Sequence, residues 1–339
     1  MKKIKIAQIG IGHNHGSEKM RSLRSLSDLY DVVGVVENDP VWWEKRGGWE
    51  MYADLPRLTE KELFSIPDLD AVAVETDGAQ LVPTALRCAQ RGLHIHLDKP
   101  GGESMKMFRS LVDLCKEKEL ALQLAYVYRY NPAIRFCIEA VRNGWLGEIF
   151  EIHTVMSRWD KDDYREWLSQ FYGGAMYIFA GYLIDVVISI LGMPDKITPF
   201  MKCTRADGLI DNGLAVLEYP KATATIRVSV DEIEGMKHRR LIVCGTKGTF
   251  ELCPIEFPSD EYRTRSMKPR LTLQKAVAGF HEGTQEVDVG PLGGRYDAQL
   301  IEFARIIRGE IRNPFDYQHE LNVQKCLLDA CGYRNGERE

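Results

Sequence analysis

The first 126 residues alternate between short apolar runs and longer segments in which apolar positions recur at helical spacing. The apolar runs predict strands at 4–9, 32–36, 70–76, 94–97 and 120–126. The segments between them predict helices at 17–29, 59–66, 81–91 and 103–119. Strands that alternate with helices at this spacing require parallel crossover connections. This half of the chain therefore predicts an α/β domain with a doubly wound parallel sheet.

From residue 148 the pattern changes to longer β-like runs with few helices between them. The runs predict strands at 149–159, 214–219, 222–230, 241–244, 249–252 and 271–274. The connections at Tyr219-Pro220 and Gly245–Gly248 are short enough for hairpins. Such a series of strands predicts an open, mostly antiparallel sheet. Helices are expected at 128–143, 173–191, 296–308 and 319–331.

The change of pattern divides the chain into two domains. A chain of 339 residues with 45% hydrophobic content can bury two sizeable cores. We place the first domain at 1–124 and the second, also α/β, at 125–339, with the last helix able to pack back on the first. The net charge is −5 and the basic residues do not cluster, so a nucleic-acid partner is not expected.

Composition also bears on the compartment. The apolar stretch after Lys2 and Lys3 is too short and too rich in glycine for a signal peptide. The run from Ala175 to Leu191 is interrupted by polar residues, so we expect no membrane span. The eight cysteines are scattered without a C-x-x-C pair or zinc spacing. We therefore expect buried thiols in a reducing cytoplasm, and no metal site.

The most informative stretch is the loop after the first strand. Gly10 and Gly12 end the apolar run, and a helix N-terminus follows His13, Asn14 and His15. Gly10 would form the tight turn, and Gly12 would let the backbone approach a pyrophosphate at the helix N-terminus. The third position of the glycine pattern holds His15 instead of glycine. The two histidines could touch phosphates or substrate, or could only cap the helix, and an ordinary strand–turn–helix without a ligand is the alternative.

Acidic and basic residues follow the other predicted parallel strands. Glu37 lies 21 residues after Gly16, about where an acid accepts hydrogen bonds from the adenosine ribose. Thr76, Asp98 and Lys99 also follow strands, and ligands of such sheets bind at the strands' carboxyl ends. Because Glu37 would repel a 2′-phosphate, the sequence favours NAD over NADP.

Two further residues carry candidate chemistry. Lys99 could donate to a substrate hydroxyl and favour its deprotonation, although a solvated loop lysine is the alternative. Tyr182 lies on the apolar helix 173–191 and shares one face with Ile178 and Asp185. A buried carboxylate is costly unless paired, so Asp185 is expected to meet an arginine, a lysine or the backbone. Tyr182 is either a core tyrosine or, placed opposite Lys99, a proton relay.

The segment after the first strand of the second half is rich in side chains suited to sugars. These residues offer stacking faces and bidentate donors, with a polar surface loop as the competing interpretation. They are Arg158, Trp159, Asp160, Asp163, Arg165 and Trp167.

This ordered set of motifs resembles the glucose–fructose oxidoreductase, inositol dehydrogenase and rhizopine-catabolism (Gfo/Idh/MocA) family of NAD(P)-dependent oxidoreductases. The matching pieces cover essentially the whole chain. They are Gly10-x-Gly12, Thr76, Asp98-Lys99-Pro100, Arg129-Tyr130-Asn131-Pro132, Leu146-Gly147-Glu148, Gly173-Gly174-Ala175 and Leu183-Ile184-Asp185. The resemblance implies a Rossmann domain followed by an α/β domain whose open sheet commonly forms subunit contacts, hence a homodimer or homotetramer. It also implies hydride transfer at a secondary alcohol of a sugar or polyol, with Lys99 at the catalytic position.

The chain departs from the family pattern at several positions. Asp98 stands where the family usually has Glu, Asp77-Gly78 where it has Pro-Asn, and Leu81 where it has His. On the helix, Ile178 and Tyr182 replace the usual Asp and His. Tyrosine at that position resembles the glucose–fructose oxidoreductase and dihydrodiol dehydrogenase branches, which keeps Tyr182 as an acid/base candidate. Isoleucine at 178 removes a hydrogen-bonding group from the expected substrate site.

The expected function is hydride transfer between NAD and a secondary alcohol or ketone of a sugar, a polyol or a related compound. A redox-neutral, NAD-dependent enzyme that cleaves glycosides and a non-catalytic NAD-binding regulator are the alternatives. Lys99 and Tyr182 are the expected catalytic residues. The expected cofactor-binding residues are Gly10, Gly12, His13, Asn14, His15, Glu37, Thr76, Asp98 and Lys99. The expected substrate-binding residues are Lys99, Arg129, Arg158, Trp159, Ile178 and Tyr182.

Overall fold

The computed structural model describes residues 2–333 and 336, and the chain divides into two compact units. The first unit contains Met1–Ala125 together with Gly294–Leu321, and the second contains Tyr126–Gly293 together with Asn322–Glu339. The first boundary between the two units follows Ala125, next to the expected boundary at residue 124. The return of segment 294–321 to the first unit differs from the expected continuous second domain, 125–339.

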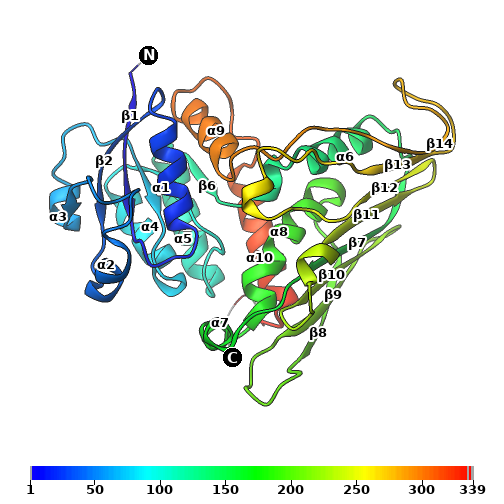
Figure 1. Ribbon diagram of the computed structural model, residues 1–339, viewed down its shortest axis with the longest axis horizontal. Coiled ribbons are helices and arrows are strands. Elements are labelled where there is room, and N and C mark those ends of the chain that lie inside the picture. The colour runs from blue at the N-terminus through cyan, green and yellow to red at the C-terminus, as the bar shows by residue number, and fades with distance from the viewer. Residues whose placement is uncertain (1, 334–335, 337–339) are drawn as a thin grey trace. The chain divides into compact units, whose positions relative to one another are not determined.

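The first unit is built on a parallel sheet with the strand order β3-β2-β1-β4-β5-β6. Figure 1 labels β1, β2 and β6 of this sheet. Its strands are β1 (Ile4–Ile9), β2 (Tyr30–Val36), β3 (Arg57–Leu58), β4 (Ala71–Val74), β5 (His94–Leu97) and β6 (Leu122–Leu124). The order reverses between β1 and β4, and ligands of doubly wound sheets bind at such a reversal. The predicted doubly wound parallel sheet is confirmed.

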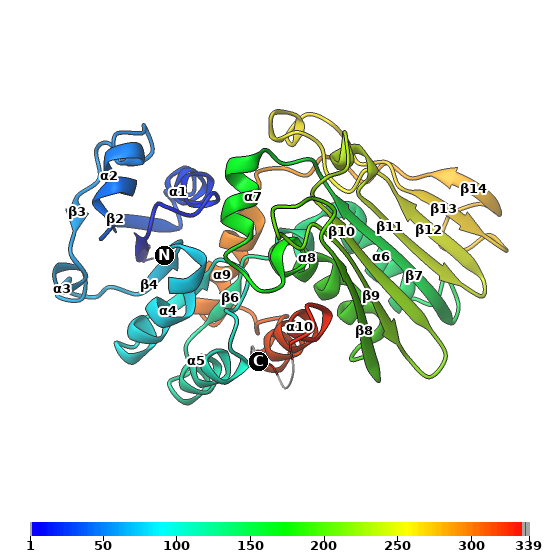
Figure 2. The same ribbon diagram turned by 90° about the horizontal axis from the view of Figure 1, so that it is seen from below.

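Helices cover this sheet. They are α1 (Gly16–Ser25), α2 (Pro40–Arg46), α3 (Glu60–Leu63), α4 (Leu81–Gln90), α5 (Met105–Glu117) and α9 (Asp297–Ile307). Helix α1 packs against α9, and α4 packs against α5. Right-handed crossovers that run in opposite directions from the centre of the sheet place α1 and α4 on opposite faces. The result is a three-layer α/β/α arrangement (Figure 2).

Polar contacts explain why α9 belongs to the first unit. The Tyr30 hydroxyl donates to the carbonyl oxygen of Leu300 at 2.5 Å, and the Ser22 hydroxyl donates to Asp297 at 2.8 Å. On β5, Nε2 of His96 lies 2.9 Å from Oε1 of Gln299. Buried polar groups require such partners. Sequence periodicity identified the helix but could not show which sheet it covers.

The second unit is built on a mixed sheet with the order β14-β13-β12-β11-β7-β10-β9-β8. Its strands are β7 (Ile149–Ser157), β8 (Lys196–Lys202), β9 (Asn212–Glu218), β10 (Thr223–Ser229), β11 (Arg240–Gly245), β12 (Gly248–Leu252), β13 (Arg270–Leu273) and β14 (Gly283–Glu286). The pair β7–β10 is parallel, and the other pairs are antiparallel. Both predicted hairpins, β9–β10 and β11–β12, are confirmed.

The helices of this unit are α6 (Pro132–Arg142), α7 (Asp162–Leu168), α8 (Gly174–Leu191) and most of α10 (Tyr317–Ala330). Helix α8 packs on β7 and β10, and α6 packs on α8 (Figure 2). Helix α8 is long and apolar enough to cross a membrane by composition, but 83% of it is buried inside the structure. Burial against the sheet accounts for its apolar composition.

Candidate cofactor and active site

The glycine loop between β1 and α1 requires glycine for reasons of packing. Gly10 has φ of +91°, and a Cβ atom there would lie 2.4 Å from the backbone nitrogen of Thr76. An L-residue would therefore be both strained and in collision with the backbone after β4. Gly16, the first residue of α1, supplies the close helix–strand packing, since its Cβ would lie 3.1 Å from the Gln8 amide nitrogen.

Glu37, at the end of β2, holds this loop with its carboxylate. One oxygen accepts from the backbone N–H of Ile11, and the other accepts from the N–H of Asp39, both at 2.8 Å. The carboxylate is thus fixed between the loop and the start of α2, at the predicted cofactor position.

Arg46, at the end of α2, supports the other side of the loop. Its Nη1 donates to the carbonyl oxygens of Ile11, Gly12 and His13 at 2.8, 3.1 and 3.0 Å. The guanidinium lies 4.6 Å from the ring centroid of Trp42, whose indole covers Gly12 so closely that a Cβ there would lie 2.7 Å away. The sequence analysis did not predict a role for Arg46. The only signal in the sequence was its position in a tryptophan-rich segment.

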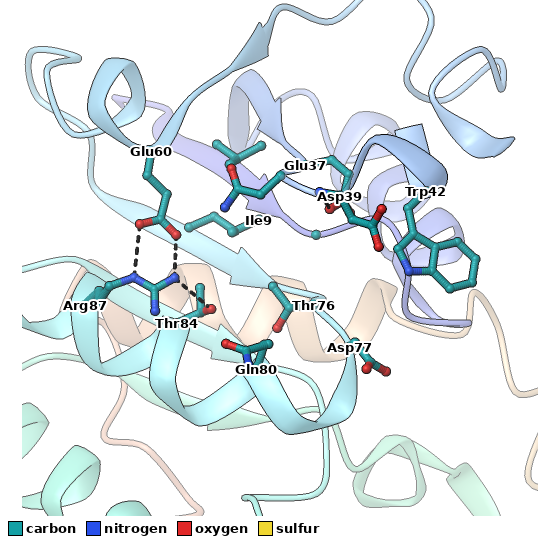
Figure 3. A pocket seen from close by; sticks show the side chains of 13 residues that line it. Ile9, Glu37, Asp39, Trp42, Glu60, Thr76, Asp77, Gln80, Thr84 and Arg87 are labelled. Atoms are coloured by element: carbon teal, nitrogen blue, oxygen red, sulfur yellow. Dashed lines mark hydrogen bonds and ion pairs between the residues drawn. The ribbon is translucent and has the colours of Figure 1, made fainter. Parts of the chain in front are cut away.

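A cavity of about 380 Å³ opens at the ends of β1, β2 and β4. Figure 3 shows the side chains around it. They are Ile9, Gly10, Val36, Glu37, Asn38, Asp39, Trp42, Glu60, Thr76, Asp77, Gln80, Thr84 and Arg87. Among the residues that the structure describes, the buried Thr76 hydroxyl has no hydrogen-bond partner. An orphaned hydroxyl beside a fixed carboxylate fits a ligand with sugar hydroxyls, such as the ribose of a dinucleotide.

The cavity is predominantly acidic. Glu37, Asp39 and Asp77 line it, while Arg87 is engaged by Glu60 with 3.0 Å between Nε and Oε2 (Figure 3). Arg87 is therefore not a free cation for a 2′-phosphate.

A buried polar cluster lies where β4 and β5 end. Nδ1 of His13 and Nδ1 of His15 lie 3.1 and 3.0 Å from the same oxygen of Asp98. Glu75 forms an ion pair with Lys19, with 3.0 Å between Oε1 and Nζ. Burial alone would raise the pKa of Asp98, but the two histidines hold that pKa well below its ordinary value. Burial, and then the Asp98 charge, raise the pKa of Glu75.

The structure decides between the alternatives for His15. Helix α1 has no side-chain cap at His15, so the capping alternative is wrong for this residue. Burial lowers the pKa of His15 to about 3, which keeps its ring neutral at pH 7. Neither histidine could be assigned to Asp98 from the sequence, because the contact joins residues far apart in the chain.

Lys99 follows β5 directly and is 3% exposed. Its backbone N–H donates to Oδ1 of Asp98 at 2.7 Å, and its positive charge contributes to the lowered pKa of His15. Lys99 is therefore a buried cation at the same edge of the sheet as Gly10, Glu37 and Thr76. The solvated-loop alternative is wrong.

In the second unit, Tyr182 is a buried residue of α8. Its ring meets the Tyr126 ring edge-on at 5.9 Å, and the Tyr128 ring lies 5.2 Å away. Gly181 makes room for this cluster, because a Cβ there would lie 2.8 Å from the Tyr126 ring. Ile178, one turn earlier on α8, is also buried.

Arg129 and Asp185 form a buried ion pair in the same unit. Nε and Nη2 of Arg129 donate to Oδ1 of Asp185 at 3.0 and 2.7 Å. The expectation that Asp185 meets a basic partner is confirmed. Arg129 was expected to bind substrate, and this pairing gives it a structural contact as well.

The segment expected to recognise sugars is partly helical. Arg158 donates to Asp160 at 2.7 Å and lies against the rings of Tyr164 and Phe179. Trp159 is 45% exposed. Residues Asp162–Leu168 form α7 instead of the alternative surface loop, and Arg165 within it is buried against Asp211 at 2.9 Å.

A doubly wound parallel sheet, a glycine loop with positive φ and an acid at the end of β2 define a dinucleotide-binding protein. Residues 4–126 match the model of the oxidoreductase family with an NAD-binding Rossmann fold, and residues 134–251 match the GFO/IDH/MocA C-terminal domain. The chain belongs to the Gfo/Idh/MocA family. It is an NAD(P)-dependent oxidoreductase whose first domain is an NAD-binding Rossmann domain.

Relatives agree with this assignment. The chain is 22% identical to the uncharacterized oxidoreductase YdgJ of Escherichia coli, over 81% of this chain and 83% of that one. It is 27% identical to D-xylose 1-dehydrogenase (NADP(+)) 2 of Haloferax volcanii, over 57% of this chain and 59% of that one. A structure of an Agrobacterium radiobacter oxidoreductase with NAD+, L-tartaric acid and magnesium shares the fold, with a TM-score of 0.80, 15% identity and coverage of 99% and 98%.

Proposed function

We propose that this protein transfers a hydride between NAD and a secondary alcohol or ketone of a sugar, a polyol or a related compound. The observation that carries the proposal is the placement of buried Lys99 after β5, at the sheet edge that also holds Gly10, Glu37 and Thr76. A lysine ammonium beside a bound nicotinamide can stabilise the oxygen on which negative charge develops.

NAD is preferred over NADP in this proposal. Glu37, Asp39 and Asp77 line the cavity, and Arg87 is paired with Glu60. A 2′-phosphate would add negative charge beside these carboxylates without a free cation to offset it. The Haloferax relative carries NADP(+) in its name. We therefore base the preference for NAD on the residues that line the cavity of this chain, and not on its relatives.

Bound NAD supplies the hydride acceptor or donor. Lys99 donates a hydrogen bond to the substrate oxygen, and Tyr182 takes the hydroxyl proton during oxidation. His13, Asn14 and His15 belong to the loop that holds the cofactor, and Asp98 fixes the backbone of Lys99.

The substrate class rests on the side chains of the second unit and on relatives named for sugars. Trp159 offers an exposed aromatic face, and Arg158 offers a guanidinium held by Asp160. Ile178 adds an apolar surface. We propose that Arg129 contributes by positioning α8 through Asp185.

The test combines NAD binding with a substrate panel. Titration calorimetry with NAD and NADP measures the cofactor preference, and NADH absorbance reports oxidation of aldoses, polyols and anhydrosugars. We expect Lys99→Met to lower turnover at least about 100-fold while NAD still binds, and Tyr182→Phe to lower turnover in the same way. Lys116→Met, on the exposed side of α5, is the matched control.

The outcomes separate the alternatives. Release of sugar without net NADH identifies the glycoside-cleaving reaction. NAD binding without oxidation across the panel identifies the regulator. Unchanged turnover of Lys99→Met contradicts the catalytic assignment.

We also propose a cytoplasmic homodimer or homotetramer formed through the open sheet of the second unit. Phe150 on β7 and Phe200 on β8 are exposed apolar side chains of that sheet. Light scattering of the purified protein measures the oligomeric state, and a monomer contradicts this part of the proposal.

A further inference from the structure

Three metal-binding side chains meet in the first unit although they come from two separate segments. His13 and His15 form a His-x-His pair in the loop between β1 and α1, and Asp98 follows β5. One ligand atom from each lies within 4.8 Å of the others. We propose that His13, His15 and Asp98 bind a divalent transition-metal ion, although the cysteine pattern predicts no metal site.

The spacing of the ligand atoms fits one ion. Nδ1 of His13 and Nδ1 of His15 lie 3.1 and 3.0 Å from Oδ2 of Asp98. Ligands bound to Zn²⁺ at about 2.0 to 2.2 Å are themselves roughly 3 Å apart in tetrahedral or octahedral geometry. The two separations from Asp98 thus match those around a shared ion, and all three ligand atoms lie within 4.8 Å of one another.

A second buried carboxylate lies beside the three ligands. Oε2 of Glu75 lies 4.0 Å from Nδ1 of His13, and Glu75 is fully buried. Within the described part of the chain, Oε2 has no hydrogen-bond donor, while Oε1 faces Lys19. A metal ion would give this oxygen a positive partner, either directly or through a bound water.

The donor set selects the class of metal. Imidazole nitrogen with carboxylate oxygen suits Zn²⁺ and similar first-row ions, whereas Mg²⁺ and Ca²⁺ prefer oxygen ligands alone. Such an ion would tie the glycine loop to the end of β5, next to the backbone of Lys99.

The experiment measures Zn²⁺ binding to the full chain after treatment with EDTA and removal of the chelator. Competition with a chromophoric chelator gives the affinity, and elemental analysis gives the stoichiometry. We expect about one Zn²⁺ per chain, and binding weakened at least about tenfold in His13→Ala and in His15→Ala. The control is His281→Ala, which removes an exposed loop histidine and should leave the affinity unchanged.

Co²⁺ provides a second readout that does not depend on activity. Its visible absorption bands report nitrogen and oxygen coordination in the wild type, and Asp98→Asn should change them if circular dichroism shows a folded protein. Absence of Zn²⁺ binding to the wild type, or equal affinity in both histidine variants, overturns the proposal. NAD binding is measured separately, so failure of the metal site leaves the proposed hydride transfer standing, and the reverse also holds.

Discussion

The carboxylate of Glu37 accepts a hydrogen bond from the backbone N–H of Ile11, with 2.8 Å between Oε2 and the nitrogen. This contact fastens the end of β2 to the glycine loop that follows β1. It orients the acid that faces the cavity and uses one of its oxygens to do so. In the proposed NAD site, cofactor recognition and loop geometry would therefore depend on the same side chain.

Replacing Glu37 with Gln should weaken NAD binding about tenfold, or ~1.4 kcal/mol, because the amide accepts weaker hydrogen bonds from a ribose. The same change should lessen the discrimination against NADP, because one negative charge leaves the cavity. Titration calorimetry with both nucleotides measures the two effects. Glu44→Gln on the exposed side of α2 is the control, and a parallel loss in both variants would refute a specific role for Glu37.

Replacing Gly10 with Ala should destabilise the protein by at least about 2 kcal/mol, because the position combines a positive φ with contact to the backbone after β4. Thermal unfolding measures the loss, and NAD binding should fall with it. Gly48→Ala is the matched control, since a Cβ there meets nothing within 4 Å. Equal melting temperatures for the two variants would contradict this account of the turn.

Replacing Arg46 with Ala should loosen the glycine loop, because three consecutive carbonyl oxygens lose a charged donor. Hydrogen exchange measured by mass spectrometry should show faster exchange in residues 11–16 and little change in β5. Arg21→Ala, which breaks an exposed ion pair with Glu18 on α1, is the control. Unchanged loop exchange would show that Trp42 and Glu37 hold the loop without Arg46.

Replacing Asp185 with Asn should cost about 3 to 5 kcal/mol of unfolding free energy, because the buried Arg129 guanidinium loses the negative charge of Asp185. Urea unfolding measures this change. Lys196→Met is the control, since its exposed ion pair with Glu218 should contribute less than about 1 kcal/mol. A loss as small as the control's would mean that Arg129 finds another partner.

Most of the fold could be predicted from hydrophobic periodicity. The parallel sheet followed from alternating strands and helices, and both hairpins followed from their turn residues. Five elements were missed, namely α2, β3, α7, β8 and β14, and two of them have an identifiable reason. Strand β8 contains Pro199 and pairs along one edge only, which the sequence pattern does not distinguish from a loop. Helix α7 is short and its charged residues mask its periodicity.

The site was predicted less completely. The position of Gly10, Glu37 and Lys99 at one edge of the parallel sheet could be predicted because it is a property of the topology. The contacts of His15 with Asp98 and of Arg46 with the glycine loop depend on side-chain directions that no local pattern encodes. Glu75 was visible only as an acid at the end of a wholly apolar strand.

The late segment that carries α9 has a consequence for synthesis on the ribosome. Every strand of the parallel sheet has been translated by residue 125, yet the acceptors for the Tyr30 hydroxyl and for His96 arrive only with Leu300 and Gln299. Domains generally fold as units while the chain emerges. Here the nascent nucleotide-binding half lacks these two partners until nearly the whole polypeptide has been made, so the domain begun first is finished late.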